Sequence, residues 1–369
     1  MKAAPDGTPG GAELPSGVEE VYAVARGIAT AVAPGGVLTA VQAPLLGALT
    51  KALTDVDVDY AALEPISADE LSAALAGHTE LYRQRIVQHM VLGELVLHPV
   101  PRDVAARVTE YATALGIDDD YVRLARRYAE GALGVAWVEL RRDGFLAHWD
   151  ENDQVPLHTK AASADPWEYA PGDAELAARW NAFADLDLGT LGRSVWEMYQ
   201  ARGFRAPGTE GEVSAYLAQH DFVHVLSDYG TTMAGELEVF AFCGRADPEP
   251  KGFAWLATMI GLFETGHVHE QGFFKMDVHD HPLEQPGMAL RLAHAIQRGK
   301  QTCEALARDL FAVDYHELVA LPVEEVREHL SIPPKREEAV LAGSFGVFDP
   351  EGMSEVQRAL GLSRAGAES

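Results

Sequence analysis

The 369-residue sequence has few cysteines, few basic residues and no charge-free run rich in Leu, Ile, Phe and Val, and each shortage excludes a class of protein. Its two cysteines, Cys243 and Cys303, lie far apart and offer neither a C-x-x-C metal motif nor a disulfide framework. We therefore expect the protein to be located in a reducing cytoplasm. Lys and Arg number 29 against 56 Asp and Glu, a formal net charge of −27. A chain this acidic lacks the clustered cations that bind phosphate backbones, so we expect no nucleic-acid partner.

The uncharged stretch of residues 27–50 is long enough to be a membrane candidate. It consists mostly of Ala, Thr and Gly and is interrupted by Pro34 and Pro44, whereas a spanning helix carries Leu, Ile, Phe and Val through its centre. We therefore predict two short buried helices and no transmembrane segment. Residues 1–17 are rich in Pro and Gly without an apolar run, which favours a disordered tail over a signal peptide.

The apolar pattern predicts an all-α fold with two helical domains. Apolar residues recur at helical intervals over residues 18–143, with capping and proline signals between the helices. Residues 144–173 are interrupted by prolines and acidic residues and indicate a linker or a wrapping loop. Helical periodicity resumes over residues 174–333, which we predict as the second domain, and residues 334–369 are expected to form a C-terminal tail.

The densest group of chemically active residues lies in the second domain. His220 and His224 are four positions apart, which on a helix places both imidazoles on one face, where they can converge on one cation. Gly230 and Gly235 indicate a break between this helix and the next. Glu236 is then expected in the first turn of a helix that doubles back toward the histidines.

This spacing predicts a metal held by His220, His224 and Glu236. Asp221 would be a fourth ligand or the carboxylate that orients a histidine. Zn²⁺ or Fe²⁺ suits imidazole and carboxylate ligands better than Mg²⁺ does. The residues alone are equally compatible with a hydrogen-bonded pair of core histidines held by the two carboxylates.

The same residues resemble the ubiquinone (coenzyme Q) biosynthesis protein 4 family, whose signature is HDxxH followed by eleven residues and Glu. HDFVHVLSDYG at 220–230 and GELEVFAF at 235–242 are similar to the family's HDxxHVLTGYG and GELALQAF. LGTLGR at 188–193 is similar to PGTLGRAY, and FAVDYHEL at 311–318 with PVEEVR at 322–327 is similar to the family's C-terminal ending. The resemblance covers residues 185–333.

The resemblance implies an all-helical homodimer that holds a metal through the HDxxH and Glu side chains, beside a channel for an isoprenoid-tailed aromatic. It also implies removal of a carboxyl group from a quinone-precursor ring, with oxygen entering at the same carbon. A divalent ion can stabilise the charge that develops as CO₂ departs, and iron can also bind O₂. We therefore expect a metal-dependent lyase or oxygenase, acting on a hydrophobic quinone-like or polyketide-like aromatic in quinone or specialised-metabolite biosynthesis.

Several residues near the motif are candidates for catalysis and substrate binding. Arg193 stands in a segment similar to the family's and can grip a carboxylate or a diphosphate. Tyr229 can donate a hydrogen bond to the substrate ring, and Asp221 can act as a proton shuttle. The residues expected to line the substrate pocket are aromatic, although aromatic residues at helical spacing often belong to the core: Tyr216, Phe222 and Phe240.

The histidine-rich segment of residues 266–281 departs from the family, in which an apolar, Gly-rich stretch is expected. It could hold a second metal, supply a general base near the first site, or close over that site as a lid. A solvated loop is the simpler interpretation. The histidines concerned are His267, His269, His279 and His281, accompanied by Glu270 and Asp280.

The role of the first domain is less defined by its sequence. Residues 82–141 resemble the small helical tellurite-resistance TerB-like domains, and we expect a docking, dimerising or lid function.

Two alternative functions apply to the whole chain. One is a non-catalytic scaffold that carries a lipid or prenyl-quinone, with at most peripheral membrane contact. The other is an HD-type metal-dependent phosphohydrolase, which would need a further upstream His and a downstream Asp.

Overall fold

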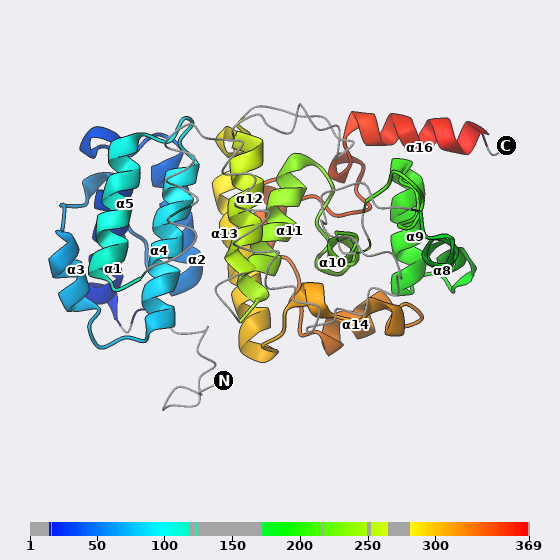
Figure 1. The fold of residues 1–369 in the computed structure, drawn as a ribbon, viewed down its shortest axis with the longest axis horizontal. Helices are drawn as coiled ribbons and strands as arrows, with labels where there is room; N and C mark the ends of the chain where they lie inside the picture. Colours follow the sequence, from blue (N-terminus) through cyan, green and yellow to red (C-terminus); the bar gives the residue numbers. More distant parts are fainter. Residues whose placement is uncertain are drawn as a thin grey trace.

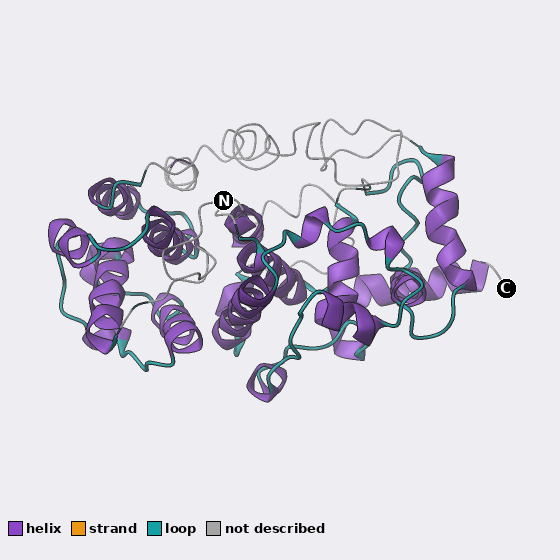
Figure 2. Ribbon diagram, turned by 90° about the horizontal axis from the view of Figure 1, so that it is seen from below, coloured by secondary structure: helices purple, strands orange, loops and turns teal. Residues whose placement is uncertain are grey.

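The computed structural model describes residues 15, 17–117, 123, 172–213, 215, 217–248, 252–264 and 281–367. Within these residues all regular elements are α-helices or short 3₁₀ helices, and none is a strand. Figure 2 shows this arrangement, with helices joined by loops in the described part of the chain. The predicted all-α fold is confirmed. The predicted tail of residues 1–17 lies almost wholly outside the described residues, as does most of the predicted linker at 144–173.

The N-terminal helices pack around one another at one end of the molecule (Figure 1). They are α1 (Val18–Val32), α2 (Gln42–Thr54), α3 (Ala68–Ala74), α4 (Glu80–Leu95) and α5 (Arg102–Ala114). The turn at Pro34 separates α1 from α2, so the uncharged stretch forms parts of two short helices, as predicted. Pro44 lies in the first turn of α2, where its missing N–H leaves no helical bond unmade. None of the helices in the described ranges is both long enough and apolar enough to cross a membrane.

The remaining helices form the middle and the far end of the molecule. They are α8 (Ala174–Asn181), α9 (Leu191–Arg202), α10 (Gln219–Ser227), α11 (Met233–Ala246), α12 (Phe253–Glu264), α13 (Met288–Ala305), α14 (Val323–His329), α15 (Glu337–Leu341) and α16 (Glu355–Ala367). Helices α11, α12 and α13 stand side by side in the centre, where α13 packs against α2 and α12 against α4 (Figure 1). These contacts join the N-terminal helices to the rest of the chain.

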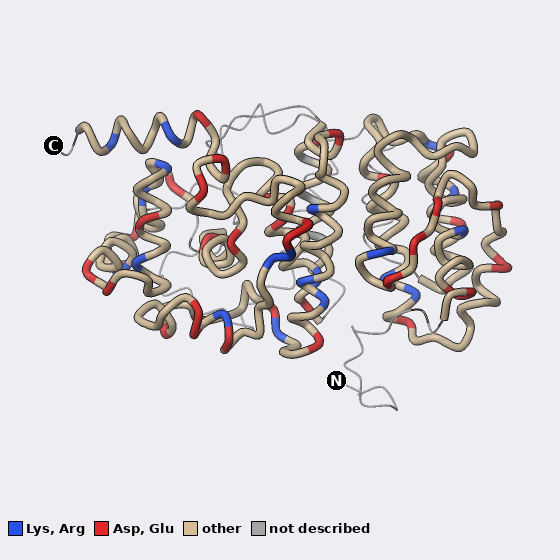
Figure 3. The backbone as a smooth tube through the Cα atoms, turned by 180° about the vertical axis from the view of Figure 1, so that it is seen from behind, with Lys and Arg blue, Asp and Glu red and all other residues tan. Residues whose placement is uncertain are grey.

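A cluster of buried apolar side chains extends through both groups of helices, from Val21 in α1 to Val347 near the C-terminus. Helix α11 is buried at every position from Met233 to Ala246. Charged residues within it therefore need partners inside the protein, because burying an unpaired charge is costly. Asp and Glu are otherwise spread over both groups of helices (Figure 3).

The segment after residue 333 differs from the expected tail, because it folds into α15 and α16 and packs on the connection between α10 and α11. Thr231 N–H donates a hydrogen bond to Gly352 O at 2.7 Å. The buried Arg202 of α9 donates to Val347 O at 2.6 Å. Apolar side chains in this segment, Ala339 and Val347 among them, are buried, which its polar and Gly-containing composition does not suggest.

The close approach of Gly230 to Gly352 gives a first prediction. A Cβ at position 230 would overlap the Gly352 carbonyl oxygen, so Gly230→Ala should lower the free energy of unfolding by about 1–3 kcal/mol. Urea unfolding followed by circular dichroism measures this. The control is Gly77→Ala, where nothing lies within 4 Å of the added methyl. Equal midpoints for the two variants and the wild type would contradict the packing described here.

Candidate metal centre

Two consecutive helices bring the predicted ligands together. Helix α10 presents His220, Asp221 and His224. It ends at Ser227 and is followed by Asp228, whose φ of 59° is left-handed. The chain then reverses, and Glu236 lies in the first turn of α11, as the glycine spacing predicts. The reversal is so tight that a Cβ on Gly235 would overlap the carbonyl of Gly230, so only glycine allows this approach.

The ligand atoms face one another at short and similar distances. His220 Nε2 lies 3.5 Å from Glu236 Oε2 and 3.5 Å from Asp221 Oδ1, and His224 Nε2 lies 3.3 Å from Glu236 Oε1. Tetrahedral zinc with bonds of about 2.0–2.1 Å separates its ligand atoms by about 3.3–3.4 Å. These spacings are compatible with ligands of one ion, and His220, Asp221 and His224 offer ligand atoms that all lie within 4.8 Å of one another. None of the four residues is more than 7% exposed.

Each inward-facing atom is positioned by a hydrogen bond on the opposite side of its residue. His220 Nδ1 contacts Leu217 O, and His224 Nδ1 lies 3.1 Å from Tyr229 O. A nitrogen next to a carbonyl must donate, so both rings carry the proton on Nδ1 and present Nε2 as a lone pair when they are neutral. Tyr199 donates its hydroxyl to Asp221 Oδ2 at 2.5 Å, which leaves Oδ1 facing the cluster.

The inner side of the cluster contains polar atoms without a hydrogen bond. Within the described residues, His224 Nε2 and Glu236 Oε2 are both buried and make none. Leaving such an atom unsatisfied costs about 1–3 kcal/mol. A divalent cation among His220, His224 and a carboxylate satisfies these atoms and neutralises two buried negative charges, so the residues fit a metal.

Without a metal, the charges of the cluster stabilise one another. Burial lowers the pKa of His220, but the Asp221 carboxylate and Glu236 outweigh burial and raise it to about 9. Burial raises the pKa of Glu236, but His224 and His220 outweigh burial and lower it to about 2. Burial and the Asp221 charge hold the pKa of Tyr199 well above its usual value, so its hydroxyl stays a donor.

Arg193 and Tyr229 make contacts other than those expected of catalytic residues. Arg193 donates to Glu197 at 2.8 Å and to Ala184 O, and its guanidinium lies over the ring of Trp196. These contacts stabilise the start of α9. Tyr229 meets His224 through its carbonyl oxygen, while its buried ring lies beneath the guanidinium of Arg298, 5.0 Å from the ring centroid.

The three residues expected to line the substrate pocket do not lie together in the structure. Phe240 stacks on His220 with ring centroids 5.2 Å apart, so it forms a wall of the cluster. Phe222 is fully buried in an aromatic group with Trp180 and Tyr315, at 5.0 and 4.8 Å, and is core packing. Tyr216 lies outside the described residues.

The histidine-rich segment is described only at its end. His267, His269 and His279, with Glu270 and Asp280, lie outside the described residues. His281 is described and lies 3.5 Å from Glu264 Oε2. The same oxygen lies 3.5 Å from Nδ1 of His98, whose ring stacks on that of His281. The sequence did not indicate these partners, because His98 is distant in the chain. The one feature of the sequence that could have indicated this group is Glu264, a single carboxylate at the end of the otherwise apolar helix α12.

No protein-family model, curated protein or solved structure matches this chain. The resemblance in the HDxxH and Glu motifs therefore remains an expectation from those residues.

The raised pKa of His220 predicts how metal binding depends on pH. A ligand imidazole must be neutral, and the pKa of His220 is about 9 without metal, so Zn²⁺ binding at pH 7 should release about one proton. The apparent affinity should then rise about tenfold per pH unit up to about pH 9. The carboxylate of Glu236, with a pKa of about 2, contributes no pH dependence in this range. Calorimetry in two buffers of different ionisation enthalpy counts the protons, and a count of zero would contradict this electrostatic description.

Proposed function

We propose that the chain is a metal-dependent enzyme, a lyase or oxygenase, that acts on a hydrophobic quinone-like or polyketide-like aromatic in quinone or specialised-metabolite biosynthesis. The observation that carries the proposal is the orientation of His220 and His224. Hydrogen bonds to main-chain carbonyls direct both Nε2 atoms toward Glu236. Helix-bound imidazoles with this outer support are typical of zinc and iron ligands.

The proposed ligands are His220, His224 and Glu236, with Zn²⁺ or Fe²⁺ as the ion. When bound, the ion supplies a Lewis acid beside the ring carbonyl or phenolate of the substrate, and iron adds oxygen chemistry. Asp221 is either a fourth ligand or the group that moves a proton. Its contact with Tyr199 favours the second role, because the Tyr199 hydroxyl holds Oδ2 at 2.5 Å and leaves Oδ1 facing the cluster, where it can accept a proton.

The surroundings of the cluster support a hydrophobic aromatic substrate. Phe240 covers His220, and Phe311 lies beyond Phe240 with ring centroids 6.2 Å apart. Apolar walls of this kind exclude water and strengthen electrostatic interactions with charge that develops on a ring. These stacked rings form an apolar wall on this side of the cluster.

The burial of the ligands favours one alternative, a non-catalytic scaffold that carries a lipid or prenyl-quinone. Closed metal sites with no exposed ligand are typical of structural ions, and His224 is fully buried. An HD-type phosphohydrolase is less well supported, because the partner of the His-Asp pair in the described structure is Glu236. A homodimeric state, a cytoplasmic location and contact with a membrane surface remain expectations.

Replacement of one ligand tests the proposal. His224→Ala should keep the helical circular-dichroism spectrum, lose the metal and abolish turnover of a carboxylated prenyl-phenol by the zinc- or iron-loaded protein in air. Mass spectrometry of the product measures turnover. The matched control is His329→Ala, at an exposed position on α14, which should retain both properties. Full metal content and turnover in His224→Ala would refute the proposal, and wild-type protein that binds the probe and returns it unchanged would favour the scaffold.

The contact between Tyr199 and Asp221 gives a separate prediction. Because the Tyr199 hydroxyl positions Asp221 as the group that moves a proton, Tyr199→Phe should lower kcat on the order of 10²-fold while the metal content stays at the wild-type value. Tyr315→Phe is the matched control, because it also removes a buried hydroxyl, which donates to Leu310 O at 2.9 Å away from the ligands. Equal kcat values for the two variants would show that the Tyr199 hydroxyl has a structural role only.

A further inference from the structure

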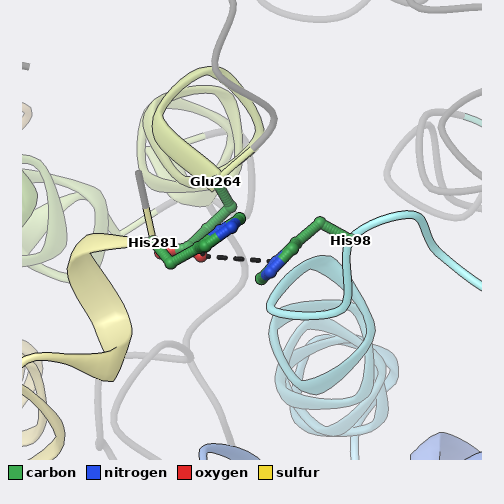
Figure 4. Close-up of side chains that lie close together, drawn as sticks. All are labelled: His98, Glu264 and His281. Carbon is green, nitrogen blue, oxygen red and sulfur yellow. Dashed lines mark ion pairs between the residues drawn. The ribbon is translucent and has the colours of Figure 1, made fainter. Parts of the chain in front are cut away.

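A second group of potential ligands lies where the N-terminal helices meet the centre of the molecule. His98 follows α4, Glu264 is the last residue of α12, and His281 precedes the 3₁₀ turn Pro282–Glu284. Figure 4 shows the three side chains directed toward one another from these separate elements. Their ligand atoms all lie within 4.8 Å of one another.

The carboxylate of Glu264 is the fixed point of this group. Its side chain is 1% exposed, and Oε1 accepts a hydrogen bond from Leu283 N–H at 2.9 Å. The other oxygen, Oε2, lies 3.5 Å from His98 Nδ1 and 3.5 Å from His281 Nδ1. These distances are again close to the separation of two ligand atoms on one zinc ion, about 3.3–3.4 Å.

The two histidine nitrogens are buried without a hydrogen bond in the described structure. The imidazoles of His98 and His281 stack with ring centroids 3.6 Å apart and planes 10° apart. Two charged rings would repel each other at this distance. Two neutral rings in the Nδ1–H tautomer would both direct their protons at the same oxygen, Glu264 Oε2, at 3.5 Å, and in the other tautomer they would place lone pairs against it, which a cation would relieve.

We propose that His98, Glu264 and His281 bind a divalent cation of the zinc class, at a site separate from the His220 cluster. Two imidazole nitrogens and one carboxylate oxygen are a donor set that zinc accepts, with a fourth position left for water. The His98 and His281 side chains are 23% and 36% exposed, which provides an entry path. Because the stacked ring planes are nearly parallel, binding of one ion would require the rings to turn so that both Nδ1 lone pairs point at it. The ion would connect the loop after α4 to α12 and to the start of α13.

The number of bound zinc ions per chain tests this site and separates it from the first one. Full-length protein is dialysed against a free-zinc buffer and analysed by elemental mass spectrometry, with zinc alone as the probe. We expect two ions in the wild type and one in His98→Ala and in His281→Ala. Glu264→Gln keeps a side-chain oxygen that can accept the hydrogen bond from Leu283 N–H, and it should also lose one ion. The control Glu284→Gln, at an exposed position beside the site, should keep both ions.

The His224→Ala variant distinguishes failure of this inference from failure of the proposed function. If only the metal centre of the proposed function is wrong, the wild type binds one ion, which His224→Ala retains and His98→Ala loses. In the His224→Ala background, zinc should raise the Tm, and addition of His98→Ala should abolish that rise. Retention of both ions by His98→Ala and His281→Ala, or a single ion lost only in His224→Ala, would overturn the inference.

Discussion

The structure around α10 and α11 depends on one constraint, which is that two imidazoles and two carboxylates are buried inside an apolar helical layer. Such groups are stable there only if each has a partner. Main-chain carbonyls and Tyr199 provide the outer partners, and the four side chains provide the inner ones for one another. Because two inner atoms still lack a hydrogen bond, a cation would complete the arrangement.

This constraint also explains the glycines and the C-terminal segment. Glu236 reaches His224 because α11 begins immediately after a tight reversal, in which Gly235 passes against the carbonyl of Gly230. The C-terminal segment then packs on Gly230 and hydrogen-bonds to the reversal through Gly352 O. Arg202 connects α9 to the same loop, so residues far apart in the chain hold the reversal in position. A substitution at any of these contacts is expected to shift Glu236 and so to alter its position relative to His220 and His224.

The sequence predicts the parts of this arrangement that are local. Helical periodicity gives the all-α fold, and the spacing from His220 to Glu236 gives the converging ligands, because helix geometry relates residues that are one turn or one reversal apart. It does not indicate Tyr199 as a partner of Asp221, the packing of residues 334–367, or the group around His98. The contacts of Tyr199 with Asp221, of Arg202 with Val347 and of His98 with Glu264 join residues more than twenty positions apart, and no local spacing encodes them. Phe222 and Phe240 look alike in sequence, and only packing separates a core residue from a wall of the site.

The central claim is that His220, His224 and a carboxylate hold a metal through ring nitrogens fixed by carbonyls. X-ray absorption spectroscopy at the zinc edge, on zinc-loaded His98→Ala protein, tests it most directly, because that variant removes the other proposed site. We expect two imidazole nitrogens and one or two oxygens at about 2.0–2.1 Å. A spectrum of zinc surrounded by water alone, or a protein that binds no zinc, would contradict the claim.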